Sequence, residues 1–173
     1  MYQTHALARL STDSRYWLSL ILLSITLLAT ALFFQYGLHE PPCIMCIHMR
    51  IWVMVLFIAG VFGILTTDRP VANLFSQAAV LGIAIGMAER AYMLLGTERG
   101  FVFADCGFSL GLPQWLALEE WFPALFRIET SCGYTPEILF GITMAESLMV
   151  LSGLLVLTCG AVLLSGLWTR LRD

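Results

Sequence analysis

The stretch YWLSLILLSITLLATALFFQYGL, from Tyr16 to Leu38, contains no charged residue and decides the fold class of the chain. A helix needs about 20 apolar residues to cross the hydrocarbon core of a bilayer, and this stretch is long enough. Three more uncharged stretches follow at 51–67, 70–88 and 147–169. Because open strands leave backbone polar groups unpaired in lipid, we expect all four to be helices.

The composition also indicates a membrane protein. Of the 173 residues, 59% are hydrophobic and 12% are charged, whereas soluble domains average about 45–50% apolar and about 25% charged residues. The predicted fold class is therefore an all-α membrane protein, a four-helix transmembrane bundle formed by a single domain, 1–173. We expect helices at approximately 16–38, 45–66, 71–95 and 142–168, with a long loop at approximately 96–137.

The charged residues divide unequally between the two sides of this bundle. Arginines outnumber acids on the side with both termini and the turn at 68–69, whereas acids outnumber arginines in the 96–137 loop. Cytoplasmic segments carry the excess of basic residues, so both termini are expected in the cytoplasm. The first helix is expected to be retained and not cleaved as a signal peptide, because its apolar run continues to Phe34. The net charge of −3 offers no basic stripe for nucleic acid.

The loop contains the run LPQWLALEEWFPALF at 112–126. In a helix, its large apolar side chains would share one face, with Glu119 and Glu120 off that face. This pattern predicts a short interfacial helix between Pro113 and Pro123, lying on the lipid bilayer. The alternative is an irregular loop whose aromatic residues pack on the end of the bundle. The expected apolar face comprises Leu112, Trp115, Leu116 and Phe122.

The run PPCIMCIHMR at 41–50 carries the candidate chemistry. With a helix beginning near Pro42, Cys43 and Cys46 lie one turn apart on one face and can cycle between dithiol and disulfide. The N–H groups and dipole of a helix start stabilise a thiolate, which makes Cys46 a candidate electron donor. Arg50 follows one turn deeper and can stabilise that thiolate or a reduced acceptor. Snorkelling of Arg50 to the interface is the alternative.

Two further cysteines, Cys106 in ADCGFS and Cys132 in TSCGYT, lie in the loop. A structural disulfide between them is one interpretation. Beside a second dithiol, the pair predicts a relay in which an external thiolate attacks the loop disulfide and the released thiolate attacks the membrane pair. The spacing does not suit a zinc site or covalent haem, so no metal is predicted. Cys159 is expected to be an inert buried thiol.

A relay that oxidises other thiols needs an electron acceptor. The sequence contains no signature for flavin, haem or nicotinamide binding. A lipid-soluble quinone is the expected acceptor, because it can reach the start of the second helix from within the bilayer.

At these residues the chain resembles the DsbB family of bacterial disulfide-generating membrane proteins. The resemblance covers most of the chain and rests on PPCIMCIHMR, the preceding FFQ, the ADCG and SCG cysteines, the 112–126 run and FGITM at 140–144. In bacteria the DsbA, DsbB and quinone system keeps the periplasm oxidising. The resemblance therefore implies a quinone-dependent oxidoreductase of the bacterial inner membrane, with the loop in the periplasm.

The resemblance also implies a role for each site residue. Cys106 forms the mixed disulfide with a reduced periplasmic partner, a DsbA-like thioredoxin-fold protein, and Cys132 is released to attack Cys43. Cys46 donates to quinone (ubiquinone or menaquinone), and Arg50 matches the quinone-site arginine of the family. Arg90 stands where many members carry an arginine. The chain departs from the family pattern at His48 and Met49 and at Ala145.

Three other interpretations stay open at this point. A protein of the vitamin K epoxide reductase type is disfavoured, because there the loop cysteines precede the Cys-x-x-Cys helix. A non-enzymatic, tetraspanin-like scaffold with structural disulfides would not need a dithiol beside a membrane arginine. A specialised DsbB relative that serves one dedicated partner fits the same residues.

Overall fold

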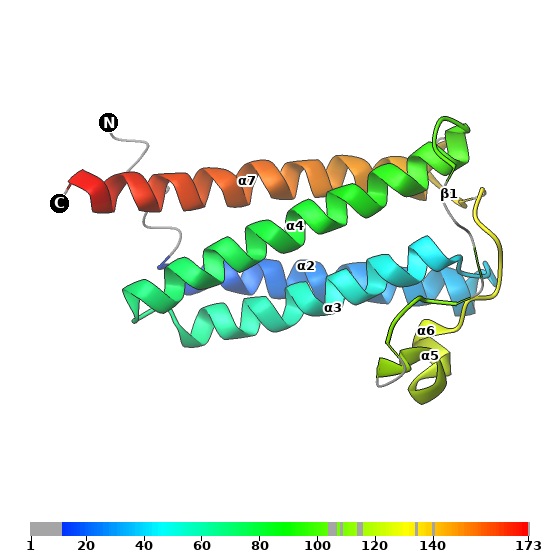
Figure 1. The fold of residues 1–173 in the computed structure, drawn as a ribbon, viewed down its shortest axis with the longest axis horizontal. Helices are drawn as coiled ribbons and strands as arrows, with labels where there is room; N and C mark the ends of the chain where they lie inside the picture. Colours follow the sequence, from blue (N-terminus) through cyan, green and yellow to red (C-terminus); the bar gives the residue numbers. More distant parts are fainter. Residues whose placement is uncertain are drawn as a thin grey trace.

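The computed structural model describes residues 12–103, 107, 109–113, 116–133, 135–139 and 141–172. Each of its four long helices is long and apolar enough to cross a membrane. They run lengthwise beside one another, and the short elements gather at the end formed by residues 100–143, here called the loop end (Figure 1). The predicted all-α four-helix fold is confirmed. The long helices are α2 (Ser14–Leu32, continued by the π-helical turn η1, Phe33–Gly37), α3 (Ile44–Leu65), α4 (Pro70–Arg99) and α7 (Met144–Arg172).

The helices pack in the order α2, α3, α4, α7, with α3 against both α2 and α4, and α4 against both α3 and α7. Trp17, Leu56 and Met87 are fully buried in the core between them. Gly63 on α3 lies against the indole of Trp17, where an added Cβ would come within 2.0 Å of the ring. Small residues at such contacts allow membrane helices to approach closely, so this glycine sets the spacing of α2 and α3.

Local signals explain where α4 and α7 meet the loop. Helix α4 runs about one turn beyond its predicted end and stops at Gly100, which has a left-handed φ of 75°. Helix α7 starts with a capping box, in which the Thr143 N–H donates to the Glu146 carboxylate at 3.1 Å and the Glu146 N–H donates to the Thr143 hydroxyl at 3.3 Å. A short hairpin that the sequence did not predict precedes it, formed by β1 (Glu137–Leu139) and β2 (Ile142–Thr143).

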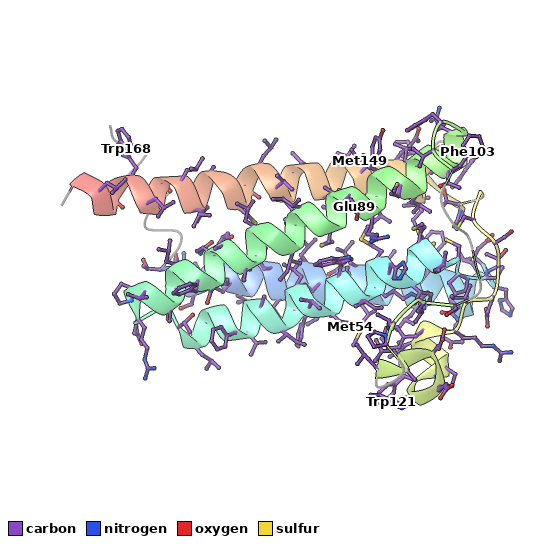
Figure 2. All side chains as sticks on the ribbon, in the orientation of Figure 1. Met54, Glu89, Phe103, Trp121, Met149 and Trp168 are labelled. Carbon is purple, nitrogen blue, oxygen red and sulfur yellow. The ribbon has the colours of Figure 1, made fainter. Side chains whose placement is uncertain are left out.

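The predicted single interfacial helix is not observed. Two one-turn helices, α5 (Leu118–Trp121) and α6 (Pro123–Phe126), replace it, while residues 114–115 lie outside the described residues. Helix α5 ends before Phe122, next to the expected boundary at Pro123; Phe122 has a non-helical φ of −134° and ψ of 66°, because a residue before proline is disfavoured in the helical region. Trp121 projects outward from this part of the loop (Figure 2) and is 57% exposed.

The contact of Gly63 with Trp17 gives a test of the packing. We expect Gly63→Ala to destabilise the protein by about 1–3 kcal/mol, because the buried indole has no room to move aside. The matched control is Gly82→Ala in α4, where an added Cβ meets no atom within 4 Å and helix propensity favours alanine. Thermal unfolding of the purified proteins in detergent measures both. Equal melting temperatures for Gly63→Ala and the parent protein would contradict this packing.

Candidate active site

The two cysteines at the start of α3 lie in contact. Cys43 is the N-cap residue of α3, in extended conformation, and its sulfur accepts a hydrogen bond from the Cys46 N–H at 3.4 Å. The two sulfur atoms are 2.9 Å apart. The cap geometry thus holds both thiols on one side of the first turn, where they can be oxidised to a disulfide bond with each other.

The two thiols differ in environment. Cys43 is fully buried, whereas Cys46 is half-buried and lines a pocket. The pKa of the Cys43 thiol is raised above its ordinary value, first by its hydrogen bond to Cys46 and then by burial. Either sulfur can donate the hydrogen bond between them, and the raised pKa favours the protonated form of Cys43.

Arg50 lies one turn deeper in α3 and is 5% exposed. Its guanidinium donates to Gln35 Oε1 at 2.7 Å, to the Leu125 carbonyl at 2.9 Å and to the Ala31 carbonyl at 3.2 Å. All three acceptors are neutral, and no carboxylate of the described residues forms an ion pair with Arg50. The Nε atom is buried and has no partner among the described residues. Among the described residues, the buried charge of Arg50 therefore has no directly paired carboxylate, and Glu129 acts on it only at longer range.

Cys46 and Arg50 line the same pocket, which has a volume of about 140 Å³. Its walls come from α2, η1, α3 and the first turns of α7, and they are predominantly apolar. Polar groups in the lining come from Arg50, Gln35, Cys46, Thr30, Ser147 and the carboxylate residue Glu40. The apolar lining includes Leu27, Phe34, Met49, Val53, Pro136, Ile138, Met144 and Leu148.

The loop returns to the same place after α6. The carbonyl of Pro42 accepts hydrogen bonds from the N–H groups of Glu129 at 3.0 Å and Thr130 at 3.4 Å, and Cys43 forms a parallel bridge with Thr130. Two residues later, Cys132 packs against the apolar cluster that contains Cys43. The structure thus brings together three of the four predicted redox cysteines. Cys106 lies outside the described residues, so its disulfide with Cys132 stays a prediction.

Several contacts around the site were missed in the sequence. No partner for Gln35 was predicted from the sequence. A lone amide at the end of an apolar helix is nevertheless a signal for a buried polar partner, which here is Arg50. His48, which was given no role, contacts the Leu110 carbonyl through Nε2 at 3.1 Å. Tyr36 donates to the Ala124 carbonyl at 2.6 Å and helps to hold α6. Arg90, which stands where many family members carry an arginine, forms an ion pair with Glu89 at 3.1 Å. It is not among the described residues that line the pocket.

Comparisons with known proteins give one consistent result. The sequence model of a family described as disulfide bond formation protein DsbB matches residues 13–162. Disulfide bond formation protein B of Shewanella loihica is 33% identical over 152 residues, covering 84% of this chain and 85% of the relative. The protein of the same name from Haemophilus influenzae strain 86-028NP is 31% identical, and the alignment covers 87% of this chain and 86% of the relative. The one from Shewanella sp. strain MR-4 is 34% identical, and the alignment covers 87% of each chain.

The unequal environments of the two thiols predict unequal reactivity. In the fully reduced protein we expect iodoacetamide to modify Cys46 faster than Cys43, because Cys43 is fully buried and Cys46 is half-buried. Peptide mass spectrometry over a time course measures both rates. Cys159, fully buried in α7 and hydrogen-bonded to Tyr16, is the internal control for an inaccessible thiol. Faster modification of Cys43 would reverse the assignment of the two cysteines.

Proposed function

The chain belongs to the DsbB family of disulfide bond formation proteins, and from this premise we propose that it passes electrons from a periplasmic thiol partner to a membrane quinone. Family membership makes it a disulfide-forming oxidoreductase of a membrane. The proposed partner is a DsbA-like thioredoxin-fold protein, and the proposed location is the bacterial inner membrane with both termini in the cytoplasm. The observation that carries the proposal is that Cys46 and Arg50 line one apolar pocket.

The pocket residues fit a quinone head group, whether of ubiquinone or menaquinone. An engineered protein cavity of about 150 Å³ accommodates a benzene ring, and this pocket has a similar volume of about 140 Å³. The apolar walls suit the ring, and the carbonyl oxygens of a quinone need hydrogen-bond donors. Arg50, with its unpartnered Nε, and the side-chain amide of Gln35 are the candidate donors. A quinone bound there supplies an acceptor for two electrons and two protons.

The proposed relay begins in the loop. A thiolate of the partner attacks the Cys106–Cys132 disulfide at Cys106, which forms a mixed disulfide and releases Cys132 as a thiolate. Cys132 then attacks the Cys43 sulfur of the Cys43–Cys46 disulfide, so that a Cys132–Cys43 bond forms and Cys46 leaves as a thiolate. Neither exchange changes the number of electrons in the protein. The packing of Cys132 against the cluster around Cys43 supports this order.

Arg50 is proposed to stabilise the charge that appears on Cys46. A positive charge held only by neutral carbonyls keeps its field available for a new anion, and a low dielectric strengthens that attraction. When the second partner thiolate resolves its mixed disulfide with Cys106, Cys106 leaves as a thiolate and attacks Cys132 of the Cys132–Cys43 bond. The loop disulfide is restored and Cys43 becomes a thiol. Oxidation of the Cys43 and Cys46 thiols to their disulfide then delivers two electrons to the acceptor.

Replacement of Cys46 tests the proposed direction of electron flow. In vesicles with ubiquinone and a reduced DsbA-like partner, Cys46→Ser should abolish steady partner oxidation, because the last cysteine before the acceptor is missing. Absorbance of the quinone follows its reduction, and alkylation of the partner follows its thiols. The control is Cys159→Ser, which should turn over at the parent rate. Full turnover by Cys46→Ser would refute the proposed mechanism.

Replacement of Arg50 tests the proposed acceptor site. Arg50→Gln should raise the KM for quinone by about tenfold or more, because hydrogen bonds to a charged group contribute about 1.5–3 kcal/mol. The same assay, with quinone varied at saturating partner, measures KM and kcat. Arg90→Gln is the matched control, since this arginine lies in a membrane helix but outside the pocket lining. An unchanged KM in Arg50→Gln, or an equal rise in Arg90→Gln, would contradict the assignment.

A further inference from the structure

Cys132 lies on a short segment, residues 130–135, that is fixed at both ends and is here called the Cys132 strap. At its start, Thr130 pairs with the strand-like segment before α3 and forms the parallel bridge with Cys43. Cys132 follows Thr130 by two positions, which limits the separation of their Cα atoms to about 7 Å along the chain. The first anchor therefore keeps Cys132 close to Cys43.

The second anchor is a hydrogen bond between side chains. The hydroxyl of Thr135 donates to Glu98 Oε2 at 2.5 Å, and Thr135 is 4% exposed. A hydrogen bond from a buried hydroxyl to a carboxylate is among the stronger kinds in proteins. Between Cys132 and this anchor, Gly133 has a φ of 115°, a backbone conformation that favours glycine. The strap thus runs from the Cys43 segment to the end of α4.

Glu98 is itself part of a fixed frame. Its Oε2 atom also accepts from the hydroxyl of Thr143, the cap of α7, at 3.3 Å. The next residue, Arg99, forms an ion pair with Glu146 in the first turn of α7. The carboxylate that holds the strap therefore belongs to α4 and is also hydrogen-bonded to the start of α7.

We infer that Glu98 and Thr135 are positioning residues for Cys132, which they hold within reach of the Cys43 sulfur. The inference rests on the proposed function, in which the Cys132 thiolate attacks Cys43 and Cys46 leaves. Holding two reacting groups together raises their effective concentration and accelerates their reaction without a new contact at the reacting atoms. Loss of this bond removes the side-chain tie between the strap and α4, while the Pro136 carbonyl still accepts from the Met144 N–H at 3.0 Å. We expect Cys132 then to sample more positions away from Cys43.

The test must separate this role from a general effect on the pocket, because the chain continues from the strap into Pro136 and Ile138, which line the pocket. The equilibrium between the Cys43–Cys132 disulfide and its two thiols separates the two effects, because it involves neither the quinone nor the thiol partner. In a Cys46→Ser, Cys106→Ser background, Cys43 and Cys132 are the remaining redox pair. Equilibration of this full-length protein in defined mixtures of reduced and oxidised glutathione, followed by alkylation and peptide mass spectrometry, gives the equilibrium constant for the Cys43–Cys132 disulfide.

We expect Thr135→Val, which removes the donor and keeps the shape, to lower this equilibrium constant by about tenfold, equivalent to about 1.4 kcal/mol. Glu98→Ala should lower it by at least this factor, because it also removes the hydrogen bond from the Thr143 hydroxyl. The double variant should lose no more than Glu98→Ala alone, because the bond to Thr135 is already absent there. Thr135→Ser should restore the parent value. Thr97→Val is the matched control, since the Thr97 hydroxyl donates only to the Met93 carbonyl within α4.

An unchanged constant in Thr135→Val overturns the inference, even if the melting temperature falls, and so does an equal loss in Thr97→Val. If the doubly substituted background does not insert into membranes, the Cys106→Ser protein gives the same comparison through the fraction of Cys132 joined to Cys43. Because no quinone or thiol partner is present, failure here leaves the proposed function untouched. Failure of the quinone assay, in turn, leaves this equilibrium unaffected.

Discussion

The buried charge of Arg50 is the constraint on which the arrangement of the loop end depends. An unpaired charge is costly in a low-dielectric interior, so polar groups must gather around it. Here they come from three separate elements: the Ala31 carbonyl near the end of α2, Gln35 in the π-helical turn, and the Leu125 carbonyl in α6. The same charge therefore fixes the end of the first helix and the position of the loop. A carboxylate in their place would have neutralised the site.

The cysteine pair gains its asymmetry from this arrangement. Cys43 caps the helix and is covered by the returning loop at Thr130, whereas Cys46 faces the pocket and the arginine. One sulfur thus borders the loop cysteine and the other borders the proposed acceptor site. Two chemically identical side chains one turn apart acquire different neighbours, because the N-cap residue contacts the returning loop and the residue one turn later lines the pocket.

The sequence predicted what depends on local pattern. Apolar length determines the four helices, and the spacing of Cys43, Cys46 and Arg50 places them together on α3, because helical periodicity is independent of distant contacts. The partners of Arg50 could not be predicted, since Leu125 lies far along the chain and acts through its backbone carbonyl. The hairpin before α7 and the strap between Thr130 and Thr135 likewise depend on pairing across the fold. The break at Phe122 was readable, because a residue before proline does not continue a helix.

We propose that the pocket beside Cys46 and Arg50 holds the electron acceptor, and photolabelling with an azido-ubiquinone in membranes can locate it. Mapping the adducts by mass spectrometry locates the quinone without relying on activity. We expect adducts on pocket residues such as Met49 of α3 and Leu148 of α7, with competition by unlabelled ubiquinone. Competed adducts confined to an outer face, such as that of the exposed Tyr92 on α4, with none in the pocket, would contradict it.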